Sequence, residues 1–226
     1  MRIAVLGTGT VGRAVAGRCA AIGHDVAIGT RDPHSTLART DTDMMGTPPF
    51  GTWHADHPEI ALLPFADAAA RGELIVNAAS GTASLEVLAL AGADNLAGKV
   101  LVDISNPLDF SAGFPPTLFV KDTDSLAEQI QRAFPEARVV KTLNTLNATV
   151  MVDPATLAGG DHSIFVSGDD AAAKATVTEL LRSVGWRDII DLGDLSSARG
   201  TEMLLPIWLR LMGTLGTPAF NFKIVR

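Results

Sequence analysis

The apolar positions of this chain follow two alternating patterns. Short runs of consecutive apolar residues are typical of strands buried on both faces, and the stretches between them repeat their apolar residues every three or four positions, as helices do. This alternation indicates an α/β fold with a doubly wound, mostly parallel sheet. We predict strands over residues 2–6, 24–29, 60–65, 73–78, 99–104, 138–142, 163–167 and 188–192, and helices over residues 10–22, 82–91, 124–134 and 170–184.

Two stretches interrupt this rhythm, residues 34–58 and residues 107–123. Neither has the period of a strand or a helix, so we expect two long loops that cover a site or take part in it. The first contains Met44, Met45, Pro48, Pro49, Phe50 and Trp53, and the second contains Pro115 and Pro116.

The last helical pattern, over about residues 196–215, is apolar nearly all the way round. Such a helix is expected to be buried against the rest of its domain or against a second subunit, and we favour a homodimer. Arg199 and Glu202 lie three positions apart, so we expect them to form an ion pair on one face of this helix. The apolar residues are Met203, Leu204, Leu205, Ile207, Trp208, Leu209, Leu211, Met212 and Leu215.

Composition narrows the possible partners. The net charge of -7, without a run of Lys and Arg, argues against a nucleic-acid or membrane-surface partner. Cys19 is the only cysteine, which excludes an internal disulfide or a cysteine-based zinc site and fits a reducing compartment. We find no signal-peptide pattern and no apolar stretch long enough to cross a membrane, so we expect a soluble, cytoplasmic protein.

A glycine-rich turn follows the first predicted strand and opens the first predicted helix. In this context the pattern GxGxxG is the fingerprint of a dinucleotide-binding Rossmann fold. The first glycine allows the tight turn, the second leaves room for a pyrophosphate, and the third lets the helix pack closely on the strand. The alternative is a glycine-rich turn that binds nothing. The turn consists of Gly7, Thr8, Gly9, Thr10, Val11 and Gly12.

The end of the second strand predicts which dinucleotide binds. NAD-specific sites place a carboxylate there, whereas this chain has Thr30 and Arg31. A hydroxyl and a guanidinium can both bind a 2'-phosphate, so we predict NADP(H). The alternative is an Asp-Pro turn in which Asp32 pairs with Arg31. We expect an NADP-binding Rossmann domain over residues 1–150 and a C-terminal α/β extension over residues 151–226, packed on it and ending in the last helix.

With these motifs placed, nearly the whole chain resembles the coenzyme F420-dependent NADP oxidoreductase family. The resemblance rests on the ordered segments GTGTVG, GTRDP, IVNAAS, LAGKVLVDISNPL, VVKTLNTLNA, FVSGDDAAAK and IDLGDLSSARGTEMLLP. It implies an enzyme that exchanges a hydride between NADPH and the deazaflavin coenzyme F420. It further implies that residues 8–12 hold the pyrophosphate, that Thr30 and Arg31 hold the 2'-phosphate, and that Ala78, Ala79 and Ser80 line the two riboses. The nicotinamide would lie near Asn106, Pro107, Leu143, Asn144 and Thr145.

Two segments depart from the family pattern. His34 and Ser35 stand where family members carry a further basic residue, and TLNTLNA is closer to related ferric or imine-type reductases. The second substrate could therefore be a flavin, a ferric chelate or a small carbonyl or imine compound. A third possibility is a protein that senses NADP(H) without turnover. The alternative partner for Arg199, in place of Glu202, is the acidic tail of the deazaflavin coenzyme.

Hydride transfer between two bound rings needs positioning more than acid-base catalysis, so no catalytic triad is expected. Lys141, Asn144 and Asn147 are candidate proton donors, and the alternative is that both asparagines cap the following helix. We interpret His54 and His57 as part of a solvated loop and predict no metal site. His24 and His162 are expected to be structural.

Overall fold

A computed structural model of the chain describes residues 1–42 and 46–226. Within these residues, one eight-stranded sheet has the order β10-β9-β8-β5-β4-β1-β2-β3. Neighbouring strands are parallel except β8 and β9, which are antiparallel. The strands are β1 (Arg2–Leu6), β2 (Asp25–Thr30), β3 (Ala61–Pro64), β4 (Leu74–Asn77), β5 (Val100–Asp103), β8 (Arg138–Thr142), β9 (Ser163–Ser167) and β10 (Asp188–Asp191).

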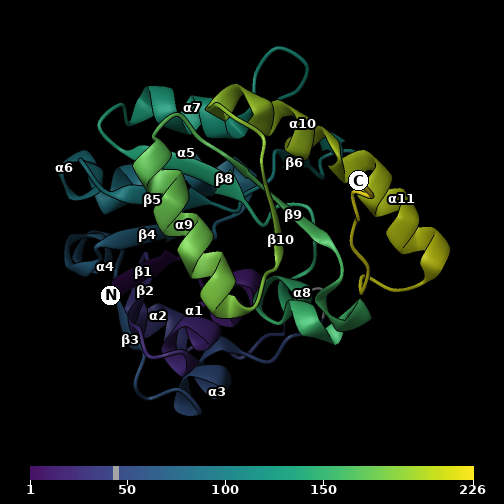
Figure 1. Cartoon of the computed structure of the whole chain (residues 1–226). Coiled ribbons are helices and arrows are strands. Elements are labelled where there is room, and N and C mark those ends of the chain that lie inside the picture. Colours follow the sequence, from purple (N-terminus) through teal and green to yellow (C-terminus); the bar gives the residue numbers. More distant parts are fainter. Residues whose placement is uncertain (43–45) are drawn as a thin grey trace.

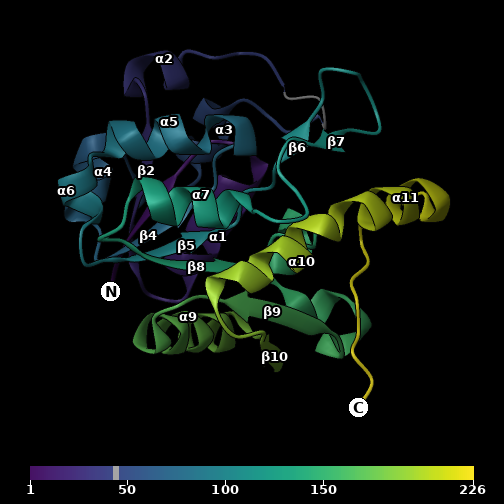
Figure 2. The ribbon, with the colours of Figure 1, turned by 90° about the horizontal axis from the view of Figure 1, so that it is seen from above.

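Helices cover both faces of the sheet (Figures 1 and 2). One face packs against α1 (Thr10–Ala21), α8 (Ala148–Val152) and α9 (Ala171–Val184). The opposite face packs against α4 (Phe65–Arg71), α5 (Gly81–Ala91), α6 (Ala93–Leu96) and α7 (Leu126–Ala133). The chain leaves β1 toward β2 and β3 and then returns through α4 to β4 on the other side of β1. This reversal puts a topological switch point between β1 and β4, where α/β folds bind ligands.

The two faces explain why the strands are continuous apolar runs. In β1, Ile3 and Val5 belong to the first core, whereas Ala4 and Leu6 belong to the second. Successive side chains of a strand point to opposite faces, so a strand covered on both faces needs apolar residues at every position. Each fully buried Leu or Ile stabilises the fold by about 1.5–3 kcal/mol.

The eight predicted strands are confirmed, and three of them, β1, β8 and β9, have the predicted bounds. Four predicted helices correspond to α1, α5, α7 and α9. Side chains fix the starts of two of them. Ser125 caps α7 by accepting a hydrogen bond from the N–H of Glu128, and Asp170 caps α9 by accepting one from Ala173.

The prediction of two long loops is wrong in part. Residues 34–58 include most of α2 (Pro33–Leu37) and all of α3 (Phe50–Ala55), while Met44 and Met45 lie outside the described residues. Residues 107–123 contain a small antiparallel hairpin of β6 (Leu108–Asp109) and β7 (Thr117–Leu118). The sequence pattern also missed α4, α6, α8 and the short 3-10 turns η1 (Pro154–Thr156) and η2 (Ala158–Gly160).

The predicted last helix is divided into three pieces. These are η3 (Leu195–Ser197), α10 (Ala198–Met203) and α11 (Leu205–Leu215). Pro206 lies in the first turn of α11, where its missing N–H is tolerated but a continuous helix would be interrupted.

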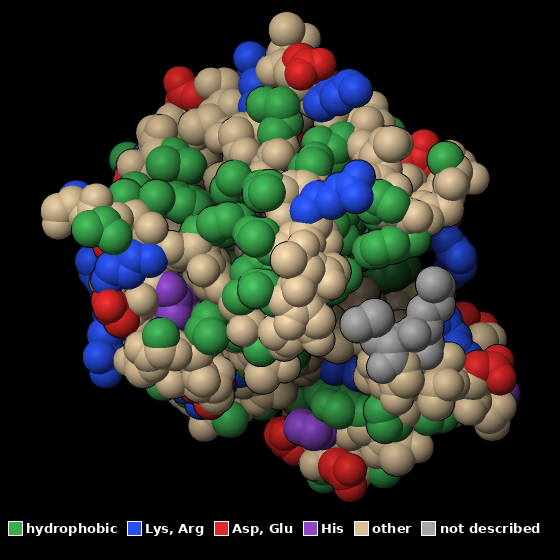
Figure 3. Space-filling model, turned by 90° about the vertical axis from the view of Figure 1, so that its right-hand side faces the viewer, with side chains coloured by type: hydrophobic (Ala, Val, Ile, Leu, Met, Phe, Trp, Pro, Cys, Tyr) green, Lys and Arg blue, Asp and Glu red, His purple; other side chains and the backbone are tan. Residues whose placement is uncertain are grey.

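The rest of this chain does not bury most of α11, and burial of the helix against a second subunit stays a prediction. Its buried residues are Leu205 and Leu209, whereas Ile207 is 48% exposed and Leu215 is 55% exposed. The helix extends away from the body of the molecule (Figure 2). Hydrophobic side chains gather across the face of the molecule on which α11 lies (Figure 3).

The C-terminal residues continue the same sheet. β9 and β10 add to its β8 edge, and α9 covers them on one side. The division into residues 1–150 and 151–226 stays a prediction. In the described parts of the chain, no helix is both long and hydrophobic enough to cross a membrane.

Candidate functional site

The glycine turn after β1 has the geometry that an approaching phosphate needs. A Cβ at Gly12 would lie 2.1 Å from the carbonyl oxygen of Gly7, so α1 packs directly on the turn. Gly7 has φ +131°, and a Cβ there would lie 2.7 Å from the carbonyl oxygen of Ala78. A Cβ at Gly9 would meet no atom of the described residues within 4 Å. Two glycines are therefore required by packing and by the backbone, and the third faces open space.

The start of α1 can accept an anion. Its N-cap is Gly9, which has no side chain to cap the helix, and its first turn contains no acidic residue. The N-terminus of a helix carries about half a positive charge, which favours a bound phosphate. Arg13 holds this turn in place, because its Nε donates to the Thr8 carbonyl at 2.9 Å and its Nη1 donates to the Pro48 carbonyl.

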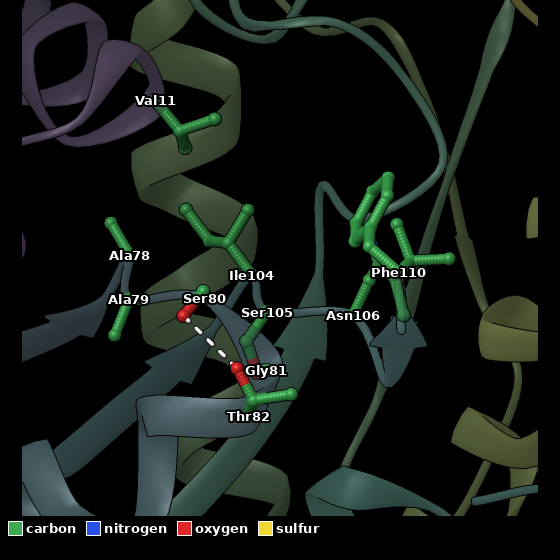
Figure 4. Close-up of a pocket in the computed structure, with 11 residues that line it drawn as sticks. Val11, Ala78, Ala79, Ser80, Gly81, Thr82, Ile104, Ser105, Asn106 and Phe110 are labelled. Atoms are coloured by element: carbon green, nitrogen blue, oxygen red, sulfur yellow. Dashed lines mark hydrogen bonds between the residues drawn. The ribbon is translucent and has the colours of Figure 1, made fainter. Parts of the chain in front are cut away.

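A cavity of about 320 Å³ opens beside this turn, at the carboxyl ends of β4 and β5 (Figure 4). Its volume is at the lower end of the range for small-molecule sites. Five of the predicted site residues line it, which brings together segments that are far apart in the sequence. The lining residues are Val11, Ala78, Ala79, Ser80, Gly81, Thr82, Ile104, Ser105, Asn106, Leu108 and Phe110.

Gly81 is a site residue that sequence reasoning missed. A Cβ at this position would lie only 1.9 Å from the carbonyl oxygen of Asn106. The first turn of α5 can therefore rest on the backbone of Asn106 only if residue 81 is glycine. The one signal in the sequence was a glycine between Ser80 and a helical pattern, which is also common in loops.

Asn106 and Asn144 bind each other at the edge of the cavity. The Asn106 amide donates to the Asn144 carbonyl at 2.8 Å, and the Asn144 amide donates to Asn106 Oδ1 at 3.0 Å and to the Thr201 carbonyl at 3.1 Å. Asn144 is therefore not the helix cap that we had allowed for, whereas Asn147 is, because it accepts from the N–H of Val150. Pro107 starts the hairpin, and its carbonyl accepts from Phe119.

The rest of the 143–145 segment lies behind the cavity wall. Leu143 has the left-handed φ of +61°, and its side chain packs into the apolar core beside Cys19. Burial raises the pKa of the Cys19 thiol to about 12, so this cysteine stays protonated and unreactive. Thr145 is 1% exposed, and its hydroxyl has no hydrogen-bond partner in the part of the chain that the structure describes.

The two predicted 2'-phosphate ligands lie in different environments. Thr30 is buried, and its hydroxyl is 2.7 Å from that of Thr36. The Arg31 guanidinium is exposed and lies 2.6 Å from a carboxylate oxygen of Glu86 on α5. The alternative Arg31–Asp32 pair does not form in the structure, because Asp32 caps α2 by accepting from the N–H of Ser35.

Behind the cavity, Lys141 forms a buried cluster with two carboxylates. Its Nζ lies 2.8 Å from Asp103 Oδ2 and 2.8 Å from Glu202 Oε1, and all three side chains are at most 2% exposed. Burial by itself lowers the pKa of Lys141, but the two carboxylates more than offset this and raise it. Lys141, a candidate proton donor, is therefore an ammonium group held between two buried carboxylates.

The predicted Arg199–Glu202 pair is wrong. Glu202 faces Lys141, and Arg199 instead makes two hydrogen bonds of 2.8 and 2.5 Å with Glu128 on α7. The two residues are three apart, but they contact α7 at different places: Glu202 accepts from the N–H groups of Leu126 and Ala127, and Arg199 binds Glu128. The alternative partner for Arg199, an acidic tail, would have to displace Glu128.

The histidines have structural contacts. His54 Nε2 bonds the Ile60 carbonyl, and the His57 ring stacks on Trp53 with its Nδ1 on the Trp53 carbonyl. His162 lies edge-on to Trp186 and bonds the Pro154 carbonyl. No group of three potential metal ligands occurs among the residues that the structure describes.

Comparison with known proteins agrees with this geometry. A family model described as NADP oxidoreductase coenzyme F420-dependent matches residues 2–107. A solved structure of a candidate F420-dependent NADP reductase from Arthrobacter sp. FB24 is 64% identical, covers 100% of both chains and superposes with a TM-score of 0.96.

Two curated relatives align with most of this chain. The F420-dependent NADP reductase of Methanothermobacter thermautotrophicus is 28% identical over 217 residues, which are 93% of this chain and 89% of that protein. Metalloreductase STEAP3 of Rattus norvegicus is 29% identical over 211 residues, which are 92% of this chain but 38% of that protein. The chain therefore spans well under half the length of the rat protein.

Proposed function

Because this chain belongs to the family of coenzyme F420-dependent NADP oxidoreductases, we propose that it exchanges a hydride between NADPH and coenzyme F420. The observation that carries the proposal is the cavity at the switch point, which joins the glycine turn to Asn106. A phosphate turn at one end and an amide-lined, largely apolar cavity at the other suit a dinucleotide that extends from its pyrophosphate to its nicotinamide.

The residues present fit NADP(H). The space beside Gly9 and the start of α1, whose N-cap is a glycine, would take the pyrophosphate, and the exposed Arg31 would take the 2'-phosphate. The ribose and nicotinamide would lie along the wall formed by Ala78, Ala79, Ser80 and Asn106. The hydroxyl of Thr30 is already bound to that of Thr36, so Thr30 would shape the end of β2 beside the phosphate and would not bind the phosphate itself.

Bound NADPH supplies a hydride, which carries two electrons and one proton, and is left as NADP⁺ with a positive nicotinamide ring. The chain itself would position the rings and exclude water. The mutual clamp of Asn106 and Asn144 fixes the polar edge of the cavity, and the side chains of Val11, Ile104 and Phe110 supply apolar walls. No described side chain at the cavity forms an acid-base dyad, which suits a reaction controlled by ring approach.

The test is a direct assay. The purified protein is mixed with NADPH and oxidised coenzyme F420, and the absorbance of both is followed. We expect both to fall together with a stoichiometry of one to one. Loss of NADPH without loss of coenzyme F420 absorbance would contradict the choice of second substrate.

The similarity to metalloreductase STEAP3 over most of the chain favours a second candidate, NADPH-dependent reduction of a flavin or a ferric chelate. Flavin mononucleotide and ferric citrate in the same assay distinguish the two. Turnover with a flavin but not with coenzyme F420 would select this candidate. Binding of NADPH without turnover of any acceptor would select a sensor.

We also propose that the protein acts as a homodimer in the cytoplasm. The exposed apolar residues of α11 support the first part, and the single buried cysteine fits a reducing compartment.

A further inference from the structure

The buried cluster behind the cavity has one more negative than positive group. It consists of the ammonium of Lys141 and the carboxylates of Asp103 and Glu202, which come from β8, β5 and α10. All three side chains are at most 2% exposed, so water screens their charges little. Neither the glycine turn nor the walls of the cavity give this cluster a function.

The hydrogen bonds around the cluster fit two carboxylates that act as acceptors. Asp103 Oδ1 accepts from the Asn77 amide at 2.9 Å and from the Ser105 hydroxyl at 2.7 Å. Glu202 accepts from the backbone N–H of Leu126 at 2.8 Å and of Ala127 at 3.2 Å. A protonated carboxyl would need an acceptor for its own proton, and its neighbours here are donors. The ionised cluster therefore has a net charge of one negative unit.

This charge lies directly behind the wall of the cavity. Ser105, which lines the cavity, donates both its hydroxyl and its N–H to Asp103. The Asn77 amide bridges Asp103 to the second wall, because its Oδ1 accepts from the N–H of Ala79. Lys141 holds the Ser105 carbonyl as well, at 2.5 Å. The wall at Ser105 therefore binds the carboxylate of Asp103 directly, and the wall at Ala79 is connected to it through Asn77. Both walls would contact the nicotinamide half of the dinucleotide.

We infer that the Lys141–Asp103–Glu202 cluster stabilises the positively charged ring of NADP⁺ relative to the neutral ring of NADPH, and so makes bound NADPH a stronger hydride donor. The inference rests on the proposed function, because it needs the nicotinamide to lie in this cavity. Its physical basis is that an interaction that is stronger with the product of hydride loss favours that loss. The start of α7 opposes the charge of Glu202, but a helix N-terminus carries only about half a unit, so the cluster stays negative.

The experiment compares the dissociation constants of NADP⁺ and NADPH, measured by fluorescence titration of the whole protein. Glu202→Gln keeps the shape of the side chain and removes one negative charge. We expect it to raise the ratio of the NADP⁺ constant to the NADPH constant by about three- to tenfold, the effect of one weakly screened charge at several ångströms. Asp103→Asn, which removes the same charge from the other side of Lys141, should change the ratio in the same direction. Lys141→Met should change it in the opposite direction.

Glu128→Gln is the matched control. It makes the same chemical change at the same junction of α7 and α10, but Glu128 pairs with Arg199 and has no contact with Lys141. Its ratio should stay within twofold of the wild type, and melting curves show that each variant is folded.

A structural defect would weaken both ligands equally, so an unchanged ratio in Glu202→Gln and Asp103→Asn overturns the inference and leaves the proposed function standing. Failure of the wild-type protein to bind either NADP⁺ or NADPH contradicts the proposed function, and the inference with it.

Discussion

Arg31 lies between two anions, the carboxylate of Glu86 in the structure and the 2'-phosphate that we propose. The ion pair with Glu86 is exposed at both ends, and such pairs contribute at most about 1 kcal/mol. A hydrogen bond to a charged phosphate is worth about 1.5–3 kcal/mol, so Arg31 should bind the phosphate in preference to Glu86.

We therefore predict that Arg31→Ala raises the KM for NADPH at least tenfold and leaves the KM for NADH unchanged. Glu86→Gln is the counterpart, since it frees the guanidinium and removes a repelling charge, and should lower the KM for NADPH. Steady-state kinetics with both dinucleotides measure these effects. Equal losses for NADPH and NADH in Arg31→Ala would remove Arg31 from the phosphate site.

Two glycines of the turn should have different roles, Gly9 in binding phosphate and Gly12 in folding. Gly9→Ala places its methyl group in open space at an ordinary φ of -73°, so the melting temperature should hardly change while NADPH affinity falls by at least tenfold. Gly12→Ala forces a methyl group against the Gly7 carbonyl and should destabilise the protein itself. Thermal melting and NADPH titration of the two variants distinguish these roles. A Gly9→Ala protein with unchanged affinity would show that no phosphate binds there.

At the scale of single residues, the sequence predicted the features that depend on the local backbone. The roles of Gly7, Gly9 and Gly12 follow from their spacing after a strand. Gly81 and the partners of Lys141 could not be predicted, because each depends on a contact with a distant segment, Asn106 in one case and Glu202 in the other. Arg199 was assigned the wrong partner for the same reason.

At the scale of elements, α7 and α10 are joined by two carboxylates of different character. Glu202 is buried at the start of α7, and Glu128 is mostly buried against Arg199. The hydrogen bond from Arg199, together with one from Ser125, lowers the pKa of Glu128 below its ordinary value.

A carboxylate with a lowered pKa in the folded state stabilises the protein above its unfolded pKa of about 4.3, and this contribution is lost as the pH falls through the folded value. We predict that Glu128→Gln is less stable than the wild type at pH 7 and that the difference shrinks as the pH falls below about 4.3 and through the lowered pKa of Glu128. Urea unfolding at pH 7, 5, 4 and 3 measures it. A difference that persists undiminished at pH 3 would contradict the role of the charge.

The predicted helices were confirmed where they are long. The 12 residues of α1 and the 14 of α9 show several turns of periodicity, whereas α2 and α8 have five residues each and cannot show a period. The last helix was predicted as one element because its apolar residues continue past Pro206. The sequence shows that these residues are apolar but not which of them find a partner.

At the scale of the whole molecule, α11 exposes apolar surface that the monomer does not cover. Ile207 and Leu215 of α11, and Met203 at the end of α10, are each more than a third exposed. We predict a dimer by light scattering, and Ile207→Glu should shift it toward the monomer because it places a charge in an apolar contact. A wild-type protein that elutes and scatters as a monomer would contradict the dimer.

The sheet was predictable as a whole because most of its strands are apolar runs, and the alternation of strands and helices permits few topologies. The hydrogen-bonded order of the strands and the antiparallel β9 were not, since they depend on where each connection crosses the sheet. The cavity follows from that order, which alone brings the ends of β4 and β5 next to the glycine turn.

Residue 143 meets two opposing demands. Its left-handed backbone favours glycine or asparagine, and the apolar pocket that it shares with Val15 and Cys19 favours leucine. The strain costs about 1–3 kcal/mol, and the lost packing of a smaller or polar residue would cost at least as much. No side chain satisfies both demands, so in a scan of all substitutions residue 143 should be among the least tolerant positions of the chain, although we place no ligand on its side chain.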